Sequence, residues 1–170
     1  WAANQLVADG LGSLAAAVVP GVTTFDLDQM AERMVREGGA EPAFKGYRGY
    51  PATLCASVNE VVVHGIPSRQ RALIDGDIIS LDMGVKLDGF YGDSAVTVPV
   101  GHVSDDVHRL LRVTQESLQR GIAQVGLGGR VSDIGHAIQE HVEAAGFSVV
   151  RSLVGHGVGR LVPGSRSVAR

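Results

Sequence analysis

Two apolar segments joined by Asp88-Gly89 restrict the fold of this chain more than any other feature. The segments cover residues 78–85 and 91–98; the first is rich in isoleucine, leucine and valine, and the second carries Val96 and Val98. An Asp-Gly pair between two such segments is typical of a two-residue β-hairpin turn. The sequence therefore predicts a long antiparallel hairpin over residues 77–98.

The register of this hairpin determines which side chains share a face of the sheet. If the residues that flank the turn pair with one another, Asp82 lies opposite Ala95 and Asp93 lies opposite Gly84. Because side chains alternate between the two faces of a strand, all four then point the same way. The two aspartates are diagonal neighbours, roughly 7–8 Å apart at the backbone. Burying two unpaired carboxylates is costly, so we expect a metal cation between them.

A second interpretation of the two aspartates stays open. An aspartate in a strand often lies at a sheet edge or on a solvated face. A register shift of one residue, or a bulge at Gly89 or Gly92, would also separate the two carboxylates. The hairpin alone does not decide between a metal site and a solvated face.

Composition narrows the class of protein. The chain has 170 residues, of which 45% are hydrophobic, and a formal net charge of −3, as expected for one soluble domain or most of one. The 15 lysines and arginines are scattered among 18 acidic residues, so we expect no nucleic-acid binding. No apolar run is long enough to cross a membrane. The single cysteine, Cys55, excludes an intrachain disulfide and a cysteine-based zinc site, and we expect a cytoplasmic protein.

The remaining pattern predicts an α+β fold with mostly antiparallel strands and helices gathered on one face. Four helices are expected: residues 3–19, a helix capped by Thr24 and ending at Gly38, a long helix capped by Ser104, and a helix capped by Ser132 and ending at Gly146. Besides the hairpin, strands are expected at residues 53–56, 61–63 and 147–154. The sequence around Pro20-Gly21 is similar to that around Gly126, which suggests two related halves.

Two histidines lie where a predicted strand ends in a glycine-containing turn. His64 precedes Gly65, and His156 lies between Gly155 and Gly157. A histidine in this position projects from rigid structure and suits a ligand or a proton donor, although a loop histidine with an ordinary hydrogen bond is the alternative for each. The other four histidines fall on helix faces and exposed turns, where we expect no functional role.

Together these segments resemble the type I methionine aminopeptidases. The resemblance rests on Asn59-Glu60-Val61-Val62-Val63-His64-Gly65-Ile66-Pro67, on the two hairpin aspartates and on Gly155-His156-Gly157-Val158-Gly159-Arg160. It covers residues 11–160 in the order and spacing of the family. It implies the pita-bread (creatinase/aminopeptidase) fold, in which two related halves surround a dinuclear metal site. We therefore expect a truncated pita-bread domain over residues 1–160, with an incomplete second half, and a tail over residues 161–170 that does not match the family.

The resemblance also implies a role for each candidate site residue. Asp82 would be a bidentate ligand of one metal ion, Asp93 would bridge two ions, and His156 would bind the second. His64 would not bind metal but would hydrogen-bond the substrate near the scissile amide, which makes it the catalytic candidate. The methionine side-chain pocket would be formed by Tyr47, Tyr50 and Cys55, and aromatic rings beside a thiol suit a thioether. The ligand set fits two divalent ions of Co, Mn, Fe or Zn without choosing among them.

The implied function is metal-dependent removal of the N-terminal methionine from nascent proteins whose second residue is small. The expected partners are nascent polypeptide N-termini, with the ribosome as a further candidate, and the complete protein is expected to be a monomer. Two other functions stay open: a non-catalytic, inactive pita-bread binding module, and a proline-specific or creatinase-like peptidase. The segment 59–67 and the tyrosine-cysteine pocket count against the proline-specific alternative.

The chain departs from the family pattern after Arg160. The family continues with a second histidine and supplies two glutamate ligands, and residues 161–170 contain neither histidine nor glutamate. These residues either join segments that are separated in the complete protein or are foreign to the family. With three of five ligands, we expect this chain to bind at most one metal ion, weakly, and to have little peptidase activity.

Overall fold

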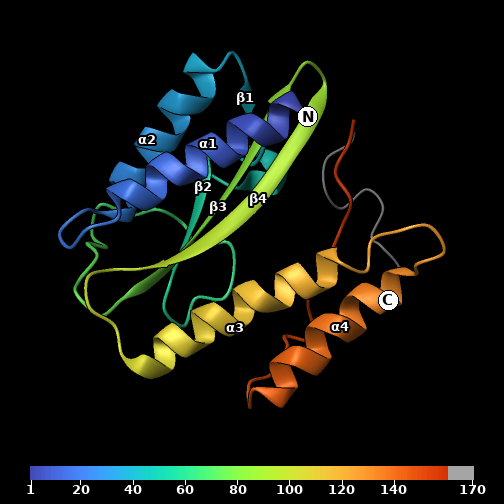
Figure 1. Cartoon of the computed structure of the whole chain (residues 1–170). Coiled ribbons are helices and arrows are strands. Elements are labelled where there is room, and N and C mark those ends of the chain that lie inside the picture. The colour runs from blue at the N-terminus through green and yellow to red at the C-terminus, as the bar shows by residue number, and fades with distance from the viewer. Residues whose placement is uncertain (161–170) are drawn as a thin grey trace. The chain divides into compact units, whose positions relative to one another are not determined.

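The structure, a computed structural model, describes residues 1–160, which form two compact units. The first unit comprises residues 1–103 with 158–160, and the second comprises residues 104–157 (Figure 1). The first unit contains α1 (Ala2–Ala17), α2 (Thr24–Glu37), β1 (Glu41–Pro42), the 3-10 helix η1 (Tyr47–Gly49), β2 (Leu54–Val58), β3 (Ile78–Leu87) and β4 (Phe90–Pro99). The second unit contains α3 (Asp105–Ile122) and α4 (Val131–Ala144).

The predicted hairpin is the centre of the first unit. β3 pairs antiparallel with β4 along its whole length, from Ile78 opposite Pro99 to Leu87 opposite Phe90. On its other edge β3 pairs antiparallel with β2 and β1. Asp88 and Gly89 both have positive φ, 51° and 77°, as a type I′ turn requires. The expected register is confirmed.

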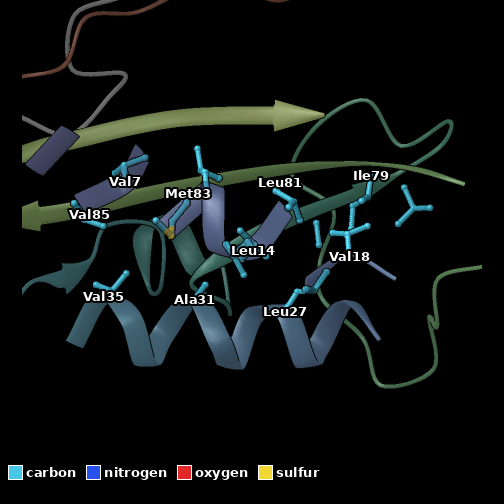
Figure 2. Packing of buried hydrophobic residues seen from close by; sticks show 14 of the residues in the cluster. Val7, Leu14, Val18, Leu27, Ala31, Val35, Ile79, Leu81, Met83 and Val85 are labelled. Atoms are coloured by element: carbon cyan, nitrogen blue, oxygen red, sulfur yellow. The ribbon is translucent and has the colours of Figure 1, made fainter. Parts of the chain in front are cut away.

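One face of the sheet packs against α1 and α2. Alternate residues of β3 are fully buried there, while the residues between them lie on the opposite face. Figure 2 shows this core, in which side chains from both helices meet the same strand. Its labelled members are Val7, Leu14, Val18, Leu27, Ala31, Val35, Ile79, Leu81, Met83 and Val85. The helices thus occupy one face of the sheet and leave the other for the aspartates.

The helices were predicted well in position and less well at their caps. Thr23, and not Thr24, caps α2: its hydroxyl accepts the Asp26 N–H at 3.1 Å, and the Asp26 carboxylate accepts the Thr23 N–H at 3.1 Å. Thr24 is buried and its hydroxyl accepts the Ser68 N–H instead. Either threonine could cap a helix with its hydroxyl, so the sequence alone does not show which one does. The hydrogen bond between Thr24 and Ser68 decides it.

The second unit is a pair of packed helices. Ser104 caps α3 as predicted. Ser132 does not cap α4, which has Arg130 as its N-cap residue, because the Asp133 carboxylate accepts the Arg130 N–H at 2.8 Å. Gly121 lets α4 approach α3, since a Cβ there would meet Ile138 at 2.9 Å.

Two of the expected strands are wrong. Residues 61–63 contain no strand, only a bend at Val63, and their valines are 42–60% exposed. Residues 147–154 contain no strand either. Both segments are rich in valine, but a strand is stabilised only by a partner that accepts and donates its ladder hydrogen bonds. Within residues 1–160 neither segment pairs with a strand.

Residues 161–170, expected to be a tail, lie outside the described part. In the described part no helix has the length and apolar character needed to span a bilayer.

The close approach of α1 to β4 is a point at which the fold can be tested. A Cβ on Gly92 would lie 2.7 Å from the Ala3 backbone, so we expect Gly92→Ala to destabilise the protein by about 1–3 kcal/mol. Gly12→Ala on α1 is the control, because a Cβ there meets nothing within 4 Å and should add up to about 1 kcal/mol of stability. Urea unfolding measures both, and equal effects would show that α1 does not pack as described.

Candidate active site

The two aspartates lie on the face of the sheet that points away from α1 and α2. Asp82 pairs with Ala95 of β4 on one side and with Cys55 of β2 on the other. Asp93 pairs with Gly84, one step further along the same face. Both aspartates are half-buried. The structure therefore brings Asp82, Asp93 and Cys55 together, as the resemblance requires.

Phe44 also belongs to this face, although its position in the sequence did not predict this. A Cβ on Gly84 would collide with the Phe44 ring, so the ring covers the backbone directly opposite Asp93. The Ala43 N–H donates to the Gly84 carbonyl at 3.0 Å and holds the preceding backbone in place. The available signal was Gly84 itself, because a glycine inside a strand often marks the close approach of another group.

Asp28 of α2 anchors the segment that carries Cys55. Its side chain is 5% exposed and one carboxylate oxygen accepts the N–H groups of Thr53 and Leu54, at 2.8 and 3.0 Å. A buried carboxylate needs such donors, and the start of β2 needs acceptors for its N–H groups. This residue was also missed, although an aspartate among the apolar positions of a predicted helix is a recognisable signal of a buried polar role.

Tyr50 and Cys55 form an uncharged surface next to the carboxylates. Burial, together with the negative charges of Asp82 and Asp93, raises the pKa of the Cys55 thiol to about 11, although a hydrogen bond with Tyr50 acts in the opposite direction. Burial, together with Cys55, also raises the pKa of the Tyr50 hydroxyl well above its usual value. Both groups are therefore protonated at neutral pH, which suits an apolar ligand better than a metal ion.

Tyr47 lies in η1, next to Arg48. The Arg48 guanidinium lies 5.4 Å from the centre of the Tyr47 ring, a cation–π distance. Arg48 has φ 49° between Gly46 and Gly49, both also with positive φ, so this turn reverses the chain sharply just before Tyr50. Tyr47 is half-buried, and the structure places it three residues before Tyr50 on the same connection into β2.

His64 lies on the connection between β2 and β3, and a buried network closes the base of that connection. Asp77 is 4% exposed and accepts the Asn59 side-chain N–H at 2.7 Å, the Ile74 N–H at 3.0 Å and the Arg71 guanidinium at 3.1 Å. Asn59 in turn accepts the Ile78 N–H at 2.9 Å. His64 itself is exposed and has φ 57°, a conformation that non-glycine residues rarely adopt.

His156 belongs to the second unit, where it is exposed and its Nδ1 lies 3.3 Å from the Gly157 carbonyl. The two aspartates belong to the first unit. Within residues 1–160, no three histidine, cysteine, aspartate or glutamate side chains form a group that could hold a metal ion. The structure thus assembles the aspartate pair and the tyrosine-cysteine surface, and the assignment of His156 as a ligand stays a prediction.

Comparison with known proteins agrees with this geometry. All of the chain, residues 1–170, matches metallopeptidase family M24. The chain belongs to this family. Methionine aminopeptidase 1 of Bacillus subtilis is 53% identical over 158 residues, which are 93% of this chain and 63% of that relative. This M24 chain therefore spans less than two thirds of the length of the curated relative.

Solved structures of a methionine aminopeptidase and of a prolidase show the same fold. The methionine aminopeptidase of Thermotoga maritima superposes with a TM-score of 0.95 at 41% identity, over 98% of this chain and 67% of that one. The prolidase of Pyrococcus furiosus superposes with a TM-score of 0.85 at 17% identity, over 99% of this chain and 48% of that one, and shows the fold alone. The expected pita-bread fold is confirmed.

The buried Asp77 network generates a prediction about acid stability. Burial alone would raise the pKa of Asp77, but its hydrogen bonds from Ile74 and Asn59 and the charge of Arg71 together hold the pKa below 3.8. A depressed folded pKa stabilises the fold above pH 3.8, and the stabilisation is lost as the pH falls through the folded value. We expect Asp77→Asn to cost about 1–3 kcal/mol at neutral pH and progressively less below pH 3.8.

Chemical unfolding from pH 7 to pH 3 measures this difference. Asp75→Asn is the control, because Asp75 lies on the same turn but is 61% exposed, so its effect on stability should be small at every pH. A difference between wild type and Asp77→Asn that stays constant down to pH 3 would contradict the assignment.

Proposed function

We propose that the whole protein is a methionine aminopeptidase, which removes the N-terminal methionine of polypeptides whose second residue is small. The observation that carries the proposal is the register of β3 and β4, which sets Asp82 and Asp93 on one face beside Cys55. The name and 53% identity of the Bacillus subtilis relative support the same activity. The match to prolidases, at 17% identity, supports only a shared fold and does not favour a proline-specific activity.

The aspartate pair fits divalent metal ions. Two carboxylates on neighbouring strands provide oxygen donors on one half-buried face, and carboxylate oxygens suit divalent metal ions. Asp82 and Asp93 would hold the ions, and His156 would be a further, imidazole ligand. Two divalent ions, of Co, Mn, Fe or Zn, would supply Lewis-acid polarisation of the scissile carbonyl and a water of lowered pKa.

The protein's own side chains would bind and orient the peptide. The protonated Tyr50 and Cys55, together with Tyr47, would receive the methionine side chain, because an uncharged, polarizable surface favours a thioether. The His64 imidazole would hydrogen-bond the peptide near its first amide and hold it in line for hydrolysis. The negative charge of the aspartates would attract the free N-terminal amine.

The substrates would be nascent chains, which places the activity in the cytoplasm and near the ribosome. We also propose that the whole protein acts as a monomer. Sedimentation with ribosomes and the mass of the purified protein in solution test these two points independently of catalysis.

The activity is tested directly with short peptides. We expect the purified whole protein, supplied with Co²⁺ or Mn²⁺, to release methionine from Met-Ala-Ser, while Met-Leu-Ser and Ala-Pro-Ser stay intact. A divalent-metal chelator should abolish the release. Preferential cleavage before proline would move the protein to the prolidase branch of the family. Binding of methionyl peptides without hydrolysis under every metal tested would favour a non-catalytic binding module.

Measuring the metal affinity of two variants distinguishes the proposed role of Asp93 as a ligand from that of His64 as a substrate-binding residue. We expect Asp93→Asn to weaken Mn²⁺ binding at least 10-fold, because a neutral amide replaces a charged ligand, and to reduce turnover. His64→Ala should reduce turnover while leaving the Mn²⁺ affinity within about 2-fold, because His64 should contact only substrate. Calorimetric titration measures the affinities.

Asp88→Asn is the matched control for this experiment. It removes a carboxylate from the same hairpin, at a type I′ position that asparagine accepts readily, so metal affinity should not change. Loss of metal from His64→Ala would show that the histidine is a ligand and that its assigned role is wrong.

A further inference from the structure

The backbone at His64 is held in a conformation that it would not adopt by itself. Its φ of 57° lies in the left-handed region, which is unfavourable for residues with a side chain. Such a conformation persists only where neighbouring groups fix it. His64 is exposed, so the groups that fix it must act through its backbone neighbours.

Those groups meet at Gly65. The Gly65 N–H donates to the Ser57 hydroxyl at 3.0 Å, and the Gly65 carbonyl accepts the Ala56 N–H at 2.9 Å. The Tyr50 hydroxyl lies 2.9 Å from the same carbonyl. A Cβ on Gly65 would collide with the backbone of Ala56, so the segment lies directly against β2.

Ser57 has the most direct effect on His64. The Gly65 N–H belongs to the peptide plane that follows the His64 Cα, so its direction sets the ψ angle of His64. Ser57 is 4% exposed, and its hydroxyl lies on the β2 face that also carries Cys55. Without this acceptor, the Gly65 N–H would lose its partner and the peptide plane would be free to rotate.

We propose that Ser57 is a positioning residue for His64: its hydroxyl fixes the peptide plane between His64 and Gly65 and thereby directs the imidazole toward the face that carries the two aspartates. This inference rests on the proposed role of His64 in peptide hydrolysis. Two residues of β2 would then have different roles: Cys55 would line the substrate pocket, and Ser57 would hold the backbone of His64.

The proposal is tested with Ser57→Ala and Ser57→Thr, of which the threonine variant keeps the hydroxyl. Ser80→Ala is the matched control: Ser80 lies opposite Ser57 on β3 and its hydroxyl bonds to Thr97 at 2.8 Å. The first measurement is NMR of the labelled protein. We expect Ser57→Ala to increase the exchange rate of the Gly65 amide at least 10-fold and to move the His64 backbone shifts away from left-handed values, whereas the other two variants should resemble wild type.

The second measurement is peptide hydrolysis by the whole protein. We expect Ser57→Ala to lower kcat for Met-Ala-Ser roughly 10- to 100-fold, because a misplaced catalytic group mainly affects the transition state. KM and Mn²⁺ affinity should stay within about 3-fold, and Ser57→Thr should restore kcat. A merely structural role would lower stability and the yield of active protein without this separation of kcat from KM.

The two measurements keep the failure of this inference distinct from failure of the proposed function. An unchanged Gly65 amide and unchanged His64 shifts in a folded Ser57→Ala variant would overturn the inference, as would equal effects from Ser80→Ala. NMR changes as expected, with unchanged kcat in an active enzyme, would overturn the link to catalysis. A wild-type protein that cleaves no methionyl peptide would overturn the proposed function, while the NMR result would still decide whether Ser57 fixes His64.

Discussion

The pairing of β3 with β4 is the constraint on which the rest of the first unit depends. The Asp88-Gly89 turn fixes the register, and the register decides which residues face the helices. A shift of one residue would send Asp82 into the core and expose Leu81, at a cost that no other part of the unit could offset. The apolar core and the polar face are therefore two consequences of one turn.

Buried polar residues also fix the loops and strand ends of this unit. Asp28 holds the start of β2, and Asp77 closes the connection that carries His64. Ser57 holds that connection against β2 near its middle. Each of these three side chains is buried and accepts at least one N–H group from a residue eight or more positions away in the chain. They stabilise the positions of loops, which would otherwise be the most mobile parts of the structure.

The proposed site places two chemically different groups of side chains next to one another. The aspartates carry the charge that suits metal ions and an N-terminal amine, while Cys55 and Tyr50 stay protonated beside them. The Phe44 ring extends the apolar surface over Gly84. This neighbouring arrangement suits a ligand with a charged amine at one end and a thioether at the other, as in an N-terminal methionine.

The sequence by itself determined the hairpin, its register, the alternation of Asp82 with core residues and the positions of the helices, because turn chemistry and periodicity act over short segments. The motifs around His64 and the aspartates also identified the family. Only the tertiary structure decided that Thr23 caps α2 and that residues 61–63 and 147–154 are not strands. It also decided the contacts of Phe44 with Gly84, of Asp28 with the start of β2 and of Ser57 with Gly65. Each of these features depends on a tertiary contact or, within residues 1–160, on the lack of a pairing strand, and neither residue type nor spacing specifies this.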